Sequence, residues 1–161
     1  GTFKNGFVGD SAYTFCVGDV SQDVRDLLEV TKVSLYLGIG QAVEGKRIGD
    51  IGYAVQSYCE SKGYSVVREM VGHGIGKKMH EAPEVPNYGR RGCGMMLRTG
   101  MVICIEPMIN QGKKGLVFER DGWTTRTVDG KCSAHFEHAV AIRKGKADIL
   151  SDFSIIEENL K

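Results

Sequence analysis

The spacing of apolar residues predicts two amphipathic helices. In the first, one face is marked by apolar or small positions three and four residues apart: Val24, Leu27, Leu28, Thr31 and Leu35. This interval is typical of a helix that buries one side, and it predicts a helix over residues 22–42. The same interval predicts a second helix over residues 48–62, which Gly63 would end. We expect both helices to be scaffold.

Short apolar runs predict strands on both sides of these helices. An Asn5-Gly6 turn signal precedes an aromatic and β-branched run, which predicts a strand over residues 7–17 with Asp10 as an interruption. Asp121-Gly122 is a second hairpin signal. The other strands are expected over residues 64–70, 101–109, 123–128 and 133–142. The last residues are expected to form a solvated helix or a frayed end.

A glycine-rich stretch over residues 71–81 contains two of the four histidines, His73 and His80. Three alternating glycines there indicate a bent loop or an irregular strand, because glycine permits positive φ and close approach of the backbone. Such a segment can direct both imidazoles into one cavity, where they would serve as metal ligands or as general acids and bases. A glycine-rich turn with two surface histidines is the alternative.

Two glutamates lie inside strongly apolar strand patterns. Glu106 interrupts the run over residues 101–109, and burial of its charge requires a partner, a hydrogen bond or a metal ion. Pro107 removes a ladder donor directly after it and indicates a local break. Glu137 is flanked by histidines, and strand alternation places it on the same face as His135. A buried salt bridge and a solvated strand face are the respective alternatives.

Composition narrows the function classes only a little. The hydrophobic share of 42% and the charged share of 25% are ordinary for a globular domain, and a net charge of +1 favours neither nucleic acid nor an anionic membrane. No stretch approaches the roughly 18 apolar residues of a membrane span. Five scattered cysteines predict neither a disulfide framework nor a thiolate zinc site, so a reducing, cytoplasmic setting is expected.

Four side chains on or beside the expected strands form a candidate metal centre: Asp10, His73, Glu106 and Glu137. Three carboxylates with one imidazole suit Co, Mn, Fe or Zn, in a site where two ions lie about 3.5–4 Å apart and activate a water molecule. The sequence lacks H-E-x-x-H and G-x-S-x-G, so it gives no support to a zincin or a serine hydrolase.

Five segments of the chain resemble, in their order and spacing, the motifs of type I methionine aminopeptidases. They are Gly9-Asp10-Ser11, Gly72-His73-Gly74-Ile75-Gly76 with His80-Glu81-Ala82-Pro83, Ile105-Glu106-Pro107-Met108, Asp121-Gly122-Trp123 and Phe136-Glu137-His138. The resemblance implies the α+β pita-bread (creatinase/aminopeptidase) fold, with antiparallel sheet and paired helices around two divalent metal ions. It also implies removal of the initiator methionine from nascent peptides at the ribosome, by a cytoplasmic monomer with no direct nucleic-acid or membrane partner.

The resemblance also implies roles for individual residues. Asp10 and Glu137 match the bridging carboxylates, and His73 matches the histidine ligand. Glu106 matches a glutamate ligand that also serves as general base or proton shuttle. His135 matches a position near the metals and is left out of the ligand set.

Three further residues match positions that contact the substrate. His80 corresponds to a histidine that is not a ligand and that stabilises the reacting carbonyl group. Met79 and Trp123 correspond to residues that line the pocket for the methionine side chain. Met79 stands where the family commonly has an aromatic residue.

The chain departs from the family pattern at its beginning. The family has a further aspartate ligand eleven positions before the residue that Asp10 matches, which falls before residue 1. We therefore expect residues 1–161 to be a single partial domain, the C-terminal portion of a pita-bread catalytic domain, and to be inactive alone. The alternatives are a prolidase-like or proline-specific aminopeptidase and a non-catalytic pita-bread module that binds peptides.

Overall fold

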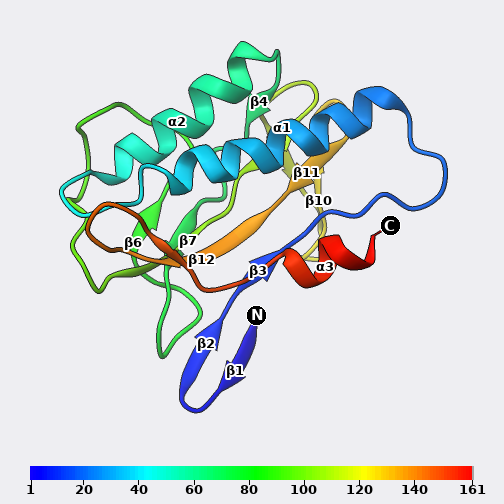
Figure 1. Ribbon diagram of the computed structural model, residues 1–161. Coiled ribbons are helices and arrows are strands. Elements are labelled where there is room, and N and C mark those ends of the chain that lie inside the picture. Colours follow the sequence, from blue (N-terminus) through cyan, green and yellow to red (C-terminus); the bar gives the residue numbers. More distant parts are fainter. Residues whose placement is uncertain (161) are drawn as a thin grey trace.

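The structure, a computed structural model, describes residues 1–160 and contains two long helices. Helix α1 spans Gln22–Ile39 and helix α2 spans Ile48–Ser61, which confirms both predicted helices with slightly earlier ends. Figure 1 shows the two helices side by side on one face of the sheet. A short helix, α3 (Ser154–Asn159), follows near the C-terminus. None of the described helices is both long and apolar enough to cross a membrane.

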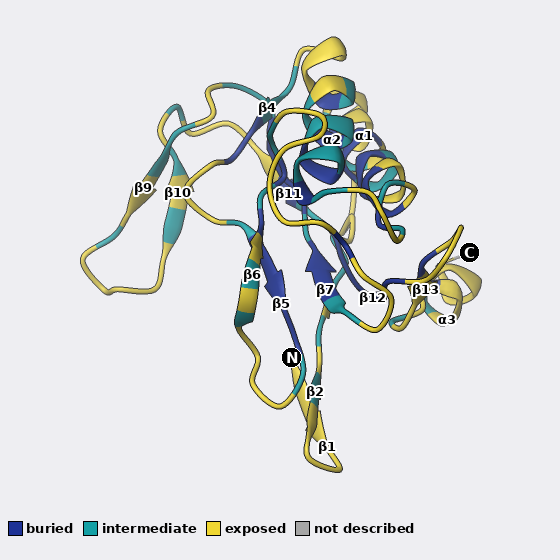
Figure 2. Ribbon diagram, turned by 90° about the vertical axis from the view of Figure 1, so that its left-hand side faces the viewer, coloured by how far each residue is buried: buried dark blue, intermediate teal, exposed yellow. Residues whose placement is uncertain are grey.

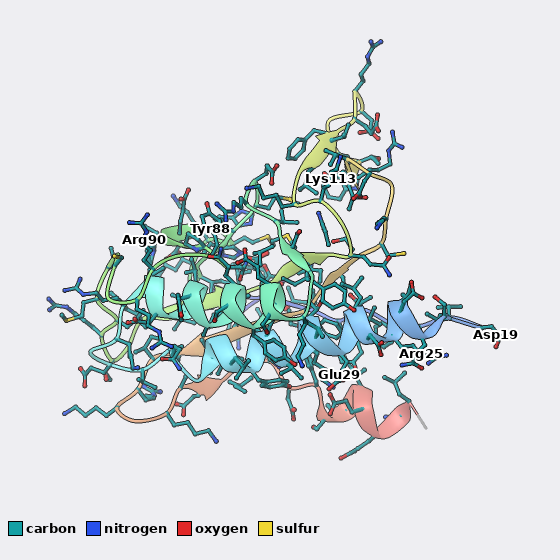
Figure 3. The ribbon with its side chains drawn as sticks, turned by 90° about the horizontal axis from the view of Figure 1, so that it is seen from above. Asp19, Arg25, Glu29, Tyr88, Arg90 and Lys113 are labelled. Carbon is teal, nitrogen blue, oxygen red and sulfur yellow. The ribbon has the colours of Figure 1, made fainter. Side chains whose placement is uncertain are left out.

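The two long helices pack closely because a glycine lies at their contact. A Cβ atom at Gly38 of α1 would lie 3.0 Å from Cγ2 of Val55 in α2. At the start of α2, the Asp50 carboxylate accepts a hydrogen bond of 2.8 Å from the backbone N–H of Arg47 and thereby caps the helix. Figure 3 shows charged side chains such as Arg25 and Glu29 on the side of α1 that faces away from α2.

The strands form a main antiparallel sheet, a smaller sheet and two hairpins. The main sheet has the order β13 (Asp148–Ile149), β12 (Glu137–Ala141), β7 (Val102–Ile105), β5 (Gly72–Gly74) and β6 (Glu81–Val85), with β3 (Ser11–Ala12) also paired to β12. The smaller sheet has the order β11 (Ser133–His135), β8 (Met108–Asn110) and β4 (Ser65–Val66). The hairpins are β1 (Thr2–Lys4) with β2 (Phe7–Gly9), and β9 (Leu116–Phe118) with β10 (Thr125–Thr127).

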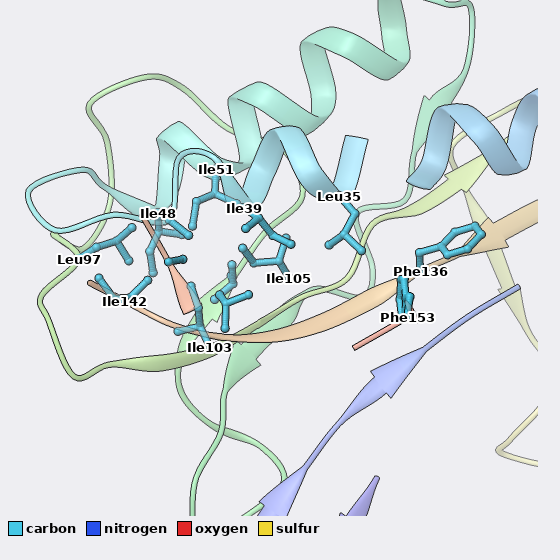
Figure 4. Close-up of a cluster of buried hydrophobic side chains, with 14 residues drawn as sticks. Leu35, Ile39, Ile48, Ile51, Leu97, Ile103, Ile105, Phe136, Ile142 and Phe153 are labelled. Atoms are coloured by element: carbon cyan, nitrogen blue, oxygen red, sulfur yellow. The ribbon is translucent and has the colours of Figure 1, made fainter. Parts of the chain in front are cut away.

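The largest apolar cluster fills the space between the two helices and the main sheet (Figure 4). Ile103 and Ile105 of β7 belong to this cluster and are fully buried. Cys104, between them, belongs instead to a small cluster with Ile75 and Ala139. Because successive strand residues point to opposite faces, Cys104 lies on the face of the sheet away from the helices. Figure 2 shows β5, β7 and β12 as the buried centre and both hairpins as largely exposed.

Both long strand runs are interrupted at the same level of the molecule. The run over residues 101–109 divides into β7 and β8 at Glu106 and Pro107, as the proline predicts. The run over residues 133–142 divides into β11 and β12 at Phe136. Since β12 pairs with β7 and β11 pairs with β8, the two breaks lie side by side where the chain passes from one sheet to the other.

The strand predicted over residues 7–17 is shorter than expected. It divides at Asp10 into β2 and β3 and ends at Ala12. Beyond that point the Thr14 hydroxyl, rather than its backbone, bonds the neighbouring chain: it donates to the carbonyl of His135 at 2.6 Å and accepts from its N–H at 3.1 Å. Val17 is 88% exposed, so the apolar run that favoured a strand is not buried there. The strand expected over residues 64–70 is likewise limited to β4.

Candidate metal centre

The structure brings together the four side chains that the sequence singles out as a metal centre. Each lies at an irregularity of the sheet: Asp10 between β2 and β3, Glu106 directly after β7, and Glu137 at the first residue of β12. His73 lies on β5, whose register with β6 shifts directly after it. The His73 Nε2 atom lies 3.4 Å from Oε1 of Glu106 and 4.0 Å from Oδ2 of Asp10.

Gly72 and Gly74 allow the strands on either side of His73 to approach closely. A Cβ atom at Gly74 would lie 2.2 Å from the carbonyl oxygen of Ala82, and one at Gly72 would lie 2.3 Å from that of Cys104. Neither glycine adopts a positive φ. The sequence allows two reasons for these glycines, a positive φ or a close approach of the backbone. The structure shows close approach, and the stretch is an irregular strand.

The hydrogen bonding of His73 leaves one of its ring nitrogens free for a ligand. Its Nδ1 atom lies 3.0 Å from the carbonyl oxygen of Gly74, which can only accept a hydrogen bond. In the neutral tautomer that donates from Nδ1 to this carbonyl, Nε2 would have a lone pair directed toward Asp10 and Glu106. This is the arrangement in which a neutral histidine binds a metal ion, with the second nitrogen held by a backbone carbonyl.

The centre concentrates negative charge in a buried place. Glu137 is only 4% exposed, and burial together with the charges of Glu106 and Asp10 raises its pKa to about 7. Buried side-chain atoms of Glu106 (Oε1), Glu137 (Oε1) and His135 (Nε2) have no hydrogen-bond partner among the described residues. Buried carboxylate oxygens without partners are costly, so the geometry fits a divalent cation that would bind the oxygens of Glu106 and Glu137.

One cysteine joins this group, and the sequence analysis did not anticipate it. Single donor atoms of Asp10, His73, Cys104 and Glu137 all lie within 4.8 Å of one another. The sequence does contain a pattern that points to Cys104. Side chains alternate along β7, so Cys104 lies on the same face as Glu106, two residues later. Burial and the neighbouring Glu137 raise the pKa of the Cys104 thiol.

The residues expected to contact a substrate lie at different distances from this centre. The ring centroid of His80 lies 4.4 Å from that of His73, and the two rings are edge to face. Met79, next to His80, is 38% exposed. Trp123 is 89% exposed in the turn between β9 and β10, and Figure 2 shows that this hairpin projects away from the main sheet. The structure thus places His80 at the centre and does not bring Trp123 to it.

Comparisons with known proteins agree on one family. Residues 1–144 match the sequence model of metallopeptidase family M24. The chain is 51% identical over 146 residues to methionine aminopeptidase B of Synechocystis sp., covering 91% of this chain and 53% of that protein. It is 49% identical over 151 residues to methionine aminopeptidase 1 of Bacillus subtilis, covering 94% of this chain and 61% of that protein.

A solved structure shows the same fold. The crystal structure of methionine aminopeptidase from Rickettsia prowazekii matches with a TM-score of 0.89 and 43% identity, over 91% of this chain and 59% of that one. The described residues therefore have the α+β pita-bread fold that the sequence resemblance implies. The chain spans between about half and three fifths of the length of these relatives.

Proposed function

This chain belongs to metallopeptidase family M24, and we propose that it carries the metal centre of a methionine aminopeptidase. The reaction would be removal of the initiator methionine from nascent proteins. The observation that carries this proposal is the meeting of Asp10, His73, Glu106 and Glu137 in one largely buried group, in which the Oε1 atoms of Glu106 and Glu137 have no hydrogen-bond partner among the described residues. The similarity to methionine aminopeptidases over more than nine tenths of the chain supports it.

We further propose that residues 1–161 form the C-terminal portion of one catalytic domain. Between about two fifths and a half of the length of these two curated relatives has no counterpart here. The resemblance assigns one more aspartate ligand and part of the substrate pocket to that length. We therefore expect the 161 residues alone to bind metal less tightly than the complete enzyme and to have little or no activity.

In this proposal the chain's own side chains hold the metal ions and position the substrate. Asp10, Glu106 and Glu137 would hold the ions through carboxylate oxygens, and His73 would hold them through Nε2. When bound, the divalent ions, for which Co, Mn, Fe and Zn all suit these donors, lower the pKa of a water molecule and polarise the scissile carbonyl. The buried position of the group excludes bulk water and strengthens these interactions.

We propose Glu106 as the general base. Its Oε1 atom lies 3.4 Å from His73, and its Oε2 atom lies 3.5 Å from Nε2 of His135. From this position the carboxylate would accept a proton from the attacking water and deliver it to the leaving amine. His80, beside His73, would donate a hydrogen bond to the carbonyl oxygen of the scissile bond and stabilise its developing negative charge.

We propose that Met79 and Trp123 contact the methionine side chain of the substrate. Met79 adjoins His80 and is partly exposed, so its thioether could contact an apolar side chain bound next to the catalytic group. Trp123 would reach the pocket only if its hairpin lay closer to the centre in the complete enzyme. The N-terminal methionine of nascent peptides at the ribosome is the proposed substrate, and the cytoplasm, where free cysteines such as these five persist, is the proposed location.

Peptide hydrolysis by the full-length protein tests this proposal. With added Co²⁺ or Mn²⁺, Met-Ala-Ser should be cleaved and Ala-Pro peptides should not. Preferential cleavage of Ala-Pro would favour a prolidase-like or proline-specific aminopeptidase. Failure to bind either metal in titration calorimetry would favour a non-catalytic pita-bread module that binds peptides.

A further inference from the structure

Cys104 is buried in the wall of the proposed metal centre. Its side chain is 0% exposed, and its sulfur lies within 4.8 Å of one donor atom from each of Asp10, His73 and Glu137. Cys104 pairs with Ala139 across β7 and β12, so it shares a sheet face with Glu137 two residues before Ala139. Sheet register, and not side-chain flexibility, fixes the sulfur there.

A buried cysteine is ordinarily a small apolar residue, and the chain offers a direct comparison. Cys59 is also 0% exposed, and it lies in a cluster of apolar residues that includes Leu27 and Val55. Cys104 has apolar contacts as well, with Ile75 and Ala139, but on its other side it faces carboxylates and an imidazole. The two cysteines are therefore equally buried, but only Cys104 lies next to atoms that can bind a metal ion.

A second observation points to a ligand at this place. Glu137 is 4% exposed and its Oε1 atom has no hydrogen-bond partner among the described residues. Metal–oxygen and metal–nitrogen bonds are about 2.0–2.2 Å and zinc–sulfur bonds about 2.3 Å, so donors that share one ion lie within roughly 4.5 Å of one another. The donor atoms of this group all lie within 4.8 Å of one another, so small side-chain movements would be enough for them to share one ion.

We propose that Cys104 supplies a sulfur ligand to one of the metal ions, in addition to the carboxylates and histidine. This inference rests on the metal centre proposed above. Binding would form a metal–sulfur bond and release the thiol proton to solvent. A sulfur donor favours thiophilic ions such as Zn²⁺, Fe²⁺ and Co²⁺ over Mn²⁺, so Cys104 would bias the metal preference that the oxygen ligands leave open.

Cobalt spectroscopy on the purified full-length protein tests the proposal without measuring activity. Anaerobic titration of the metal-free protein with Co²⁺ should give weak visible bands from bound cobalt and a stronger near-ultraviolet band from sulfur-to-cobalt charge transfer. Cys104→Ser should keep the visible bands and lose the near-ultraviolet band. Cys59→Ser, the matched control with an equally buried sulfur, should keep both.

The outcomes separate this inference from the proposed function. Visible bands without a near-ultraviolet band in the unsubstituted protein, or a near-ultraviolet band that persists in Cys104→Ser, would overturn the sulfur ligand and leave the metal centre standing. Absence of any cobalt binding would overturn both. If Cys104→Ser does not fold, as judged by circular dichroism, ¹¹³Cd NMR of the unsubstituted protein decides instead, because a sulfur ligand moves the cadmium resonance strongly downfield of positions typical of oxygen and nitrogen ligands.

Metal preference gives an independent readout. Competition titrations should show that Cys104→Ser lowers the ratio of Zn²⁺ affinity to Mn²⁺ affinity by roughly tenfold or more, the scale on which changes around a metal site act. Cys59→Ser should leave the ratio unchanged. An unchanged ratio in Cys104→Ser would contradict the proposal.

Discussion

Replacing Glu137 by glutamine should stabilise the metal-free protein at alkaline pH, although it removes a proposed metal ligand. The pKa of Glu137 is raised from 4.5 to about 7 by burial and by the charges of Glu106 and Asp10. Between these values the folded state keeps a proton that the unfolded chain has lost. The contribution of this group to the stability of the folded state therefore falls as the pH rises from 4.5 to 7. Above pH 7 the full cost of burying the ionised carboxylate is present.

The magnitude follows from the size of the shift. A difference of 7 − 4.5 pKa units corresponds to about 3 kcal/mol at 1.36 kcal/mol per unit. Without metal, Glu137→Gln should thus be more stable than the unsubstituted protein by about 3 kcal/mol at pH 8 and by less than about 1 kcal/mol at pH 5. With saturating Mn²⁺ or Co²⁺ the order should reverse, because the unsubstituted protein then gains an ion that the variant binds poorly.

Comparison with a variant is necessary because a neighbouring histidine has the opposite pH dependence. Burial lowers the pKa of His138 from 6.5 to about 4, so its contribution to stability is lost as the pH falls through that range. The two effects offset each other in the unsubstituted protein, whose own pH profile should be comparatively flat. The difference between the protein and its Glu137→Gln variant isolates the carboxylate.

Urea unfolding followed by circular dichroism, in the presence of a chelator, measures this difference. Glu84→Gln on β6 is the control, because Glu84 is exposed and should give no pH-dependent difference. If Glu137→Gln changed the free energy of unfolding by the same amount at pH 5 and pH 8, the assignment of a buried, charge-repelled carboxyl group would be wrong.

Three further predictions concern the scaffold. His138→Gln should be less stable than the unsubstituted protein at pH 7, because it loses the ring whose centroid lies 3.8 Å from that of Phe153, but its stability should rise on going to pH 5 in a urea titration, because the Glu137 effect is then no longer offset. Gly74→Ala should destabilise the fold by about 1–3 kcal/mol and weaken metal binding in calorimetry, since its Cβ would meet a β6 carbonyl at 2.2 Å, whereas Gly40→Ala, with its nearest contacts at 3.5 Å, should not. Ile51→Ala, at a fully buried site, should cost about 2–5 kcal/mol in thermal or urea unfolding, and a loss below 1 kcal/mol would contradict the packing described.

The predictable parts of the fold are those in which local pattern and burial agree. Helices α1 and α2 follow from apolar spacing, and the Asn5-Gly6 hairpin turn follows from two residues that tolerate positive φ, which are observed at 53° and 85°. The break at Glu106 follows from the proline after it. In each case a few neighbouring residues decide the backbone conformation.

The strand over residues 7–17 was predicted wrongly because its apolar run meets no continuous ladder beyond Ala12. Strand pairing depends on a neighbour that is distant in sequence, and here the Thr14 side chain bonds the neighbouring backbone at His135 instead. The place of Cys104 was missed for a related reason. Its relation to Glu137 depends on the register of β7 with β12, which the residues around either one do not reveal.

The sequence by itself determined which side chains could do chemistry: charged residues inside apolar strands need a partner, and this requirement can be read at Asp10, Glu106 and Glu137 without coordinates. Only the tertiary structure decided that these carboxylates, His73 and Cys104 meet on one face of the main sheet, and that Trp123 lies apart from them. The physical reason is that local pattern fixes how a residue points from its own strand. Which distant residues become its neighbours depends on the sheet register and on the two breaks, between β7 and β8 and between β11 and β12, that lie side by side.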